Sequence, residues 1–181
     1  MLTAPSGFFR GMPKKGGFMK PLVFMVVMGV FSGLLKAAIS ILELKILAGM
    51  GKVVVAVLFV PVTVSLFGFV AALVLFVIWR LMGSRQSYQT SYRCVAYMSA
   101  LMPVMVVVSG VPFWGGLAGI AILFFLVVIV STEVHGIPPT KARVVFATLA
   151  VLLVVMYVNA EHERKQLEIQ KIHQQQGKPK Y

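Results

Sequence analysis

The feature that most constrains this chain is a run of 27 residues without a charged side chain, from Val53 to Trp79. As a helix this run would be about 40 Å long, whereas the hydrocarbon core of a bilayer is about 30 Å thick. The run is therefore long enough to span a membrane, and it must tilt, kink or protrude. Pro61 offers a position for a kink, and Trp79 beside Arg80 indicates a membrane interface.

Four further apolar runs repeat this character: Pro21–Leu42, Cys94–Val111 with a break at Pro103, Leu117–Thr132 and Val144–Val158. The whole chain is 59% hydrophobic with a mean hydropathy of +0.93, and only 12% of its residues are charged. Soluble domains carry roughly 25% charged residues. We predict an all-α, polytopic transmembrane bundle of about five helices, with no soluble domain large enough to carry out chemistry.

The polar segments divide the chain into three parts. Residues 1–20 form a basic leader, in which Phe8 and Phe9 beside Arg10 favour a short interfacial segment; an unstructured leader is the alternative. Residues 21–160 form the membrane domain. Residues 161–181 form a polar tail. We expect the helix of the last span to continue into this tail and to end before Gly177.

Three segments interrupt the membrane domain. The clearest boundary is the linker Arg80–Arg93, followed by an uncharged turn at 110–116 and a second polar loop, Glu133–Arg143. If all five runs span, the leader and the two polar segments share one side and carry nine Lys and Arg residues, against two on the other side. The tail would add five to that second side. Since N-terminal segments usually dominate, we predict a cytoplasmic N-terminus and an external C-terminus.

Basic residues outnumber acidic ones by 17 to 5. A nucleic-acid-binding protein would gather such charge on one face of a folded module. Here the charges lie in short segments between apolar runs, which favours contact with anionic lipid head groups and argues against nucleic acid. Cys94 is the single cysteine, so no intrachain disulfide is possible. The three histidines are widely separated, and we expect no metal and no cofactor.

Several short motifs resemble the bacterial members of the Yip1-domain family. They are Gly7-Phe8-Phe9-Arg10-Gly11-Met12-Pro13, Gly16-Gly17-Phe18-Met19-Lys20-Pro21-Leu22-Val23-Phe24, Tyr92-Arg93 with Tyr97, Pro112 with Gly115, and Glu133-Val134-His135-Gly136-Ile137 before Lys141-Ala142-Arg143. The resemblance covers about residues 5–158. It implies five helices, a cytosolic N-terminus and a non-enzymatic role in a bacterial inner membrane. The short leader lacks the longer N-terminus of the eukaryotic members, so their binding of small GTPases is not carried over.

The candidate functional residues are few, because catalysis needs paired groups within reach of one another. We select five polar residues at the edges of the spans as candidates for a site or for interfacial contacts: Lys36, Glu43, Glu133, His135 and Lys141. Capping, or snorkelling in the case of Lys36, is the simpler interpretation of each. No nucleotide-binding, hydrolase or zinc motif is present. Gly29 with Gly33, and Gly115 with Gly119, form GxxxG pairs that favour close helix packing, within the bundle or between protomers.

Two hypotheses of function follow. The first is a structural or interaction subunit, which organises a membrane complex or the bilayer through lateral helix contacts with other membrane proteins or with a second copy. The second is a small transporter or channel subunit, for which Pro61 and Pro103 would break helices and Thr63 and Ser65 would supply polar groups. An enzyme acting on lipid head groups ranks third, since the sequence has no credible nucleophile–base pair.

Overall fold

A computed structural model describes residues 4–13, 16–42 and 46–176, and within these ranges the chain is helical, without strands. The elements are α1 (Pro5–Gly11), α2 (Met19–Leu42), α3 (Ile46–Leu58), α4 (Val60–Leu81), α5 (Tyr88–Met98), the 3₁₀ turn η1 (Ser99–Leu101), α6 (Met102–Val108), α7 (Trp114–Glu133) and α8 (Pro139–Gln176). Five segments are long and apolar enough to cross a membrane: Met19–Leu42, Val60–Leu81, Tyr88–Val108, Trp114–Glu133 and Pro139–Leu167. The predicted bundle of five spanning helices is confirmed.

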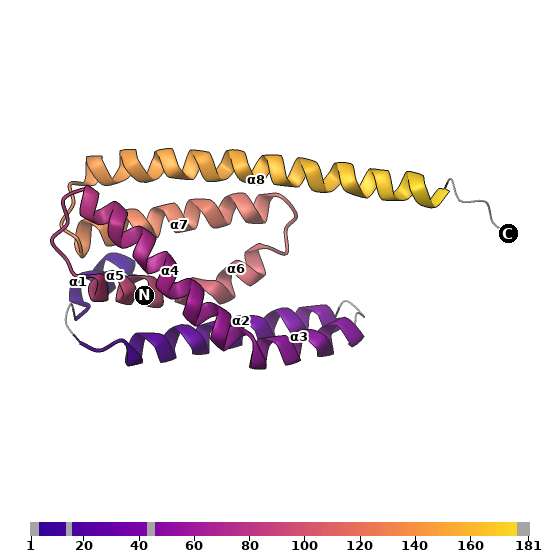
Figure 1. Cartoon of the computed structure of the whole chain (residues 1–181), viewed down its shortest axis with the longest axis horizontal. Helices are drawn as coiled ribbons and strands as arrows, with labels where there is room; N and C mark the ends of the chain where they lie inside the picture. The colour runs from indigo at the N-terminus through magenta and orange to yellow at the C-terminus, as the bar shows by residue number, and fades with distance from the viewer. Residues whose placement is uncertain (1–3, 14–15, 43–45, 177–181) are drawn as a thin grey trace.

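The 27-residue apolar run is kinked, as its length required. The helix breaks at Phe59, so that α3 packs along α2 and α4 crosses the bundle at an angle (Figure 1). Pro61 lies in the first turn of α4. Proline is tolerated there because its missing N–H would have no partner in the first turn of a helix. The predicted kink at Pro61 therefore lies two residues from the observed break.

The linker expected at Arg80–Arg93 is wrong in its bounds. Helix α4 continues to Leu81 and α5 begins at Tyr88, so the connection is residues 82–87. Ser87 caps α5 by accepting a hydrogen bond from the Thr90 amide at 3.3 Å. The polar residues of this stretch suggested a loop, but Thr90, Ser91 and Arg93 are buried in the first turns of α5. Arg93 accordingly lies inside the third span instead of before it.

The other two connections are also shorter than expected. The uncharged turn narrows to residues 109–113, since Trp114 and Gly115 already belong to α7. Phe113 has a φ of 63°, and the Tyr157 hydroxyl of α8 donates to its carbonyl at 3.1 Å. The second polar loop shrinks to residues 134–138 because α8 begins at Pro139. The tail continues α8 to Gln176 as expected, and its predicted end before Gly177 falls outside the described residues.

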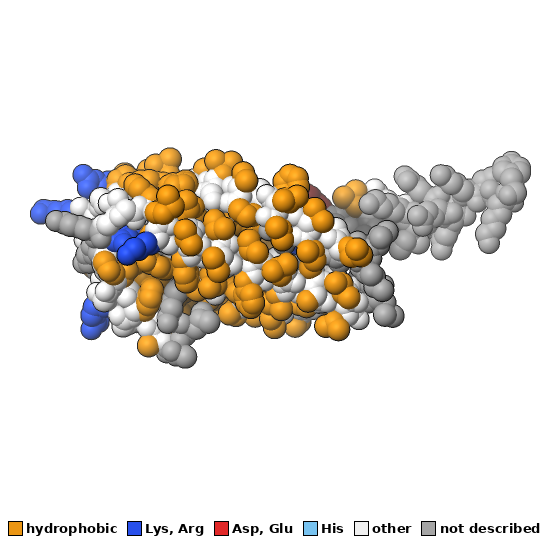
Figure 2. All heavy atoms as spheres, turned by 90° about the horizontal axis from the view of Figure 1, so that it is seen from below, with side chains coloured by type: hydrophobic (Ala, Val, Ile, Leu, Met, Phe, Trp, Pro, Cys, Tyr) orange, Lys and Arg blue, Asp and Glu red, His pale blue; other side chains and the backbone are white. Residues whose placement is uncertain are grey.

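The basic segments lie at one end of the bundle, hereafter the basic end. The connections 82–87 and 134–138 meet there beside α1, at the left of Figure 1, while the 109–113 turn and the last turns of α8 lie at the opposite end. Figure 2 shows Lys and Arg gathered at the same end, next to a belt of hydrophobic side chains. The distribution matches the prediction that these segments share one side of the membrane.

The leader is part of this fold. Helix α1 packs against α7, and Phe9 is fully buried in the core together with Trp79 and Val130. The unstructured alternative is wrong because α1 is a helix, whereas the interfacial position of the segment stays a prediction. Neither expectation included the burial of Phe9 against side chains of the spans.

Candidate functional site

The structure brings three of the five candidate polar residues together at the basic end. Glu133 ends α7, His135 lies in the following connection, and Lys141 lies in the first turn of α8. Lys36 lies far from them, near the other end of α2. Glu43 falls outside the described residues. Glu133, His135 and Lys141 therefore lie at the same end of the bundle, and each contacts a segment distant in the sequence.

Glu133 forms a bidentate ion pair with Arg10 of α1. Arg10 Nε lies 2.8 Å from Glu133 Oε2, and Arg10 Nη2 lies 3.1 Å from Oε1. The hydrogen bond and the charge of Glu133 raise the pKa of Arg10 above its ordinary value, so the guanidinium stays charged. The Arg10 side chain is 74% exposed and the Glu133 side chain 20%, which places the pair at the surface of the fold. Its role is to attach α1 to the end of α7.

His135 is buried between α4 and α7. Its Nδ1 lies 2.8 Å from Ser84 Oγ, and its ring stacks on Trp79 with 3.9 Å between the centroids. The Trp79 indole donates to Ser131 Oγ at 2.8 Å. A Ser–His contact of this kind resembles a nucleophile and its base. Here both residues are buried and Ser84 Oγ also accepts the Gln86 amide, so the pair fixes the 82–87 connection.

Two further cations hold backbone carbonyls at this end. Lys141 Nζ donates to the Met82 carbonyl at 2.8 Å, which satisfies a carbonyl at the end of α4. Arg93 Nη1 donates to the Pro13 carbonyl at 2.6 Å. Gly16 has a φ of 140°, and a Cβ there would lie 2.8 Å from the Arg93 guanidinium. The conformation favours glycine at position 16, and a Cβ there would also displace the Arg93 guanidinium.

The basic end is thus a structural clamp. It ties α1, the 82–87 connection, α5 and the start of α8 to one another through side chains that each reach across the bundle. Among the described residues, no group of three His, Cys or Glu side chains could hold a metal ion. The sequence alone pointed to Glu133, His135 and Lys141, but gave no signal for their partners Arg10, Ser84 and Met82.

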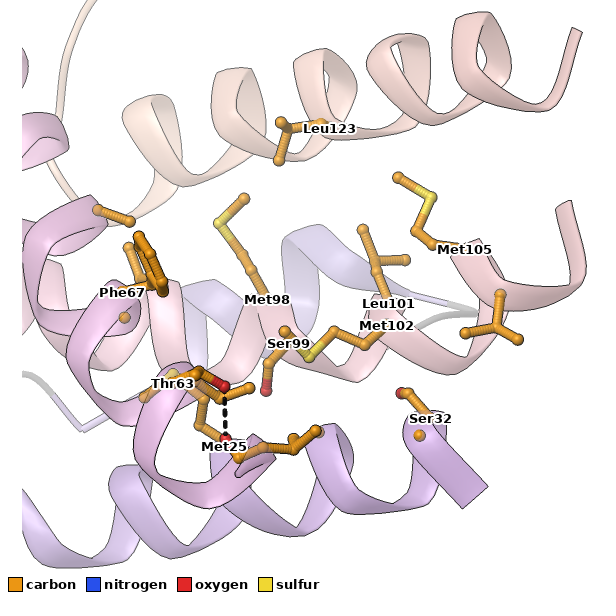
Figure 3. Close-up of a pocket in the computed structure, with 18 of the residues that line it drawn as sticks. Met25, Ser32, Thr63, Phe67, Met98, Ser99, Leu101, Met102, Met105 and Leu123 are labelled. Atoms are coloured by element: carbon orange, nitrogen blue, oxygen red, sulfur yellow. Dashed lines mark hydrogen bonds between the residues drawn. The ribbon is translucent and has the colours of Figure 1, made fainter. Parts of the chain in front are cut away.

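A large groove opens between the spans, away from this clamp. It has a volume of about 910 Å³ and is lined by α2, α4, α5, η1, α6 and α7. Figure 3 shows side chains from these helices pointing into it: Met25, Ser32, Thr63, Phe67, Met98, Ser99, Leu101, Met102, Met105 and Leu123. Lys36 and Gly33 also line the groove. The sequence had suggested Lys36 as a snorkelling residue and had given no indication of a groove.

The candidate packing glycines lie inside the bundle in three of four cases. A Cβ added at Gly29 would lie 3.0 Å from side chains of Val60 and Val64. One added at Gly119 would lie 3.1 Å from the end of the Met105 side chain. Gly115 lies against the backbone of Val108 and Ser109 across the 109–113 turn. The fourth glycine, Gly33, is half-buried at the groove.

Helix α8 is the most peripheral span. Only 6% of the residues in its apolar 18-residue stretch are buried, compared with 44% of those in the Tyr88–Val108 span. It packs mainly on α7, and its last turns run beyond the other helices (Figure 1). The exposed apolar side chains near its middle are Val151, Leu152, Leu153, Val155, Met156 and Val158. They face more than one direction around the helix, so α7 covers only part of it.

Comparison with known proteins gives one positive result. No curated protein and no solved structure matches the chain. The Yip1 domain matches residues 1–159, which include the leader helix, all the contacts of the basic end and the apolar part of the last span. That match covers most of the chain and agrees with the family suggested by its motifs. This five-span integral membrane protein therefore belongs to the Yip1-domain family.

Proposed function

We propose that this protein is a non-enzymatic membrane subunit that binds the transmembrane helix of another membrane protein along α8. Yip1-family membrane proteins are generally non-enzymatic. The observation that carries the proposal is the exposure of α8, in which only 6% of the residues of the apolar 18-residue stretch are buried. The polar continuation of α8 to Gln176 adds a second surface that the same partner can contact outside the membrane.

Lateral binding fits the rest of the molecule. The spans place few polar groups in the membrane, and the clamp at the basic end fixes the bundle without presenting a reactive group. Helices associate in lipid through van der Waals packing, since lipid tails are as apolar as leucine. A partner would therefore gain contacts with α8 at little cost in desolvation. This arrangement would let the protein organise a complex while the bundle itself stays rigid.

Site-specific photocrosslinking tests the proposal. A photoreactive amino acid replaces Val151 or Met156 on α8, or Val27 on α2 as the comparator, since all three side chains are exposed. After irradiation of native membranes, we expect a discrete crosslinked membrane protein from the α8 positions and none from Val27. A product containing only a second copy of the chain would assign α8 to self-association. Crosslinks from Val27 alone, or from no position, would overturn the proposal.

The proposed orientation places the basic end in the cytoplasm of a bacterial inner membrane, facing anionic head groups. Arg85 is exposed at the basic end and Ser109 is exposed at the opposite end, whereas Cys94 is buried. A membrane-impermeant maleimide applied to intact cells should label Ser109→Cys and leave Arg85→Cys unlabelled. The reverse pattern would invert the proposed topology.

Transport is the alternative, and the helix break at Phe59 favours it, because transporters bind substrates at broken helices. Thr63 lies one turn after that break and lines the groove. However, the hydroxyls of Thr63 and Ser65 donate to carbonyls of their own helix. Solute flux into reconstituted vesicles that is lost in Thr63→Val and Ser65→Ala would support transport. Flux unchanged by both substitutions would count against a pathway along α4.

A further inference from the structure

We propose that the groove between α2, α4, α6 and α7 binds the acyl chains of an anionic phospholipid, whose phosphate pairs with Lys36. This site lies on a different surface from the α8 contact proposed above. It would bind a lipid from the leaflet opposite the basic end.

The charge of the groove is concentrated in one side chain. Among the described residues that line it, Lys36 alone is charged. Its side chain is exposed, and no hydrogen bond or ion pair joins its Nζ to the part of the chain that the structure describes. Anionic head groups of the bilayer supply phosphates that can pair with such a lysine.

The depth of Lys36 suits a head group. It lies 17 residues after Met19, the first residue of α2. At 1.5 Å per residue this is about 26 Å along the helix, close to the far edge of a hydrocarbon core of about 30 Å. A lysine side chain at this depth can extend its ammonium group to the head-group region while its methylene groups stay among lipid tails.

The walls of the groove suit hydrocarbon. The hydroxyls that line it already have hydrogen-bond acceptors in the preceding turn: Ser32 donates to the Met28 carbonyl, Thr63 to Phe59 and Ser99 to Ala96. Met25, Met98, Met102 and Met105 supply flexible thioether side chains, which adapt to ligands of variable shape. The volume of about 910 Å³ lies at the upper end of the range for small-molecule sites. The groove can therefore hold long apolar chains.

The groove is open to the side and closed toward the basic end. Phe67 and Val74 of α4 line it and remain 67% and 53% exposed. One turn beyond the lining residues Leu75 and Val127, the hydrogen bond from Trp79 to Ser131 joins α4 to α7. An acyl chain can therefore enter laterally, and its head group must lie at the Lys36 end.

Native mass spectrometry of the full chain, released from nanodiscs, tests the site. Phosphatidylglycerol and phosphatidylcholine are the two probes, and bound lipid is counted per protein. We expect phosphatidylglycerol to be retained over phosphatidylcholine, and Lys36→Gln to lower its retention about fivefold. Lys20→Gln removes the same charge from the basic end of α2 and should lower the retention of phosphatidylglycerol less than Lys36→Gln does. Equal retention of both lipids, or no effect of Lys36→Gln, would overturn the assignment.

A second variant tests the groove independently of charge. Ala71 lines the groove and is exposed, so Ala71→Phe should fill the space without entering the core. Ala147, exposed on α8, provides the matched control as Ala147→Phe. A phosphatidylglycerol with a diazirine near the end of one chain should label peptides of α2, α4 and α6, and Ala71→Phe should abolish this labelling. Labelling unchanged by Ala71→Phe, or a lipid-free dimer in which α4 contacts its copy, would reject a lipid in the groove.

Discussion

Arg10 and Glu133, 123 residues apart in sequence, form two parallel hydrogen bonds that attach the leader helix to the end of the fourth span. The pair lies beside the buried ring of Phe9, the only residue of α1 that is fully buried. A seven-residue helix is too short to persist alone in water. Its order must therefore come from tertiary contacts, which include these two and the edge-on contact of Phe8 with Tyr97.

Charge reversal tests the contribution of the ion pair. Arg10→Glu places two carboxylates together, and we expect severalfold faster amide hydrogen exchange over residues 5–11. The double variant Arg10→Glu with Glu133→Arg restores the pair and should restore protection. Because the Arg10 side chain is 74% exposed, salt should screen the interaction, and 1 M NaCl should reduce the difference between the variants. Exchange that is the same in Arg10→Glu and the wild type would show that the apolar contacts of Phe8 and Phe9 hold α1 without the ion pair.

The buried indole of Trp79 provides a second prediction. Ser131→Ala removes the acceptor of its N–H, and we expect the free energy of unfolding to fall by about 0.6 kcal/mol, the average for hydrogen bonds between transmembrane helices, and by no more than about 1.7 kcal/mol. In a Trp114→Phe background, the fluorescence of Trp79 reports the change directly. Ser109→Ala is the control, since that exposed hydroxyl bonds only to its own helix. Equal stability of both variants would mean that the indole finds another acceptor.

The stability lost when a glycine is replaced by alanine depends on which atoms lie against the new methyl group. Gly115→Ala should destabilise the protein by about 1–3 kcal/mol, because the new methyl group would meet the backbone of Val108. Gly119→Ala should cost less, since the end of the Met105 side chain can move aside. Gly7→Ala meets nothing within 4 Å and should be neutral. Thermal unfolding in detergent measures the stability of all three variants. If Gly115→Ala instead abolished self-association and left the stability unchanged, Gly115 would pack between protomers.

The sequence predicted the spans well because the thickness of the bilayer sets the length of an apolar run. It also predicted the kink near Pro61 and the helical tail, both of which depend on local chemistry. It failed at the bounds of Arg80–Arg93, a stretch whose polar and small residues suggested a loop throughout. Arg93 is buried in α5, where its guanidinium reaches the Pro13 carbonyl, a contact that no local pattern encodes.

The same limit applies to the candidate site. Glu133, His135 and Lys141 stood out because they border the fourth span, and the structure brings them together. Their partners Arg10, Ser84 and Met82 come from distant segments and could not be paired without the fold. The groove could not be predicted either, because it is a space between α2, α4, α6 and α7 that exists only once these helices have packed.

The tail should be separable from the fold. Tyr157 contacts Phe113 at the end of the bundle, and α8 then runs on to Gln176 beyond the other helices (Figure 1). A chain that ends at Ala160 keeps the Tyr157 contact and all of the basic end, so its thermal stability should equal that of the full chain. If α8 binds a partner as proposed, the shortened chain should still crosslink to that partner through a photoreactive residue at position Val151. Its affinity for the partner should fall by the contribution of the polar turns of α8. Quantitative co-purification of the partner with both chains measures that loss. A shortened chain that unfolds at a lower temperature would show instead that the tail stabilises the bundle.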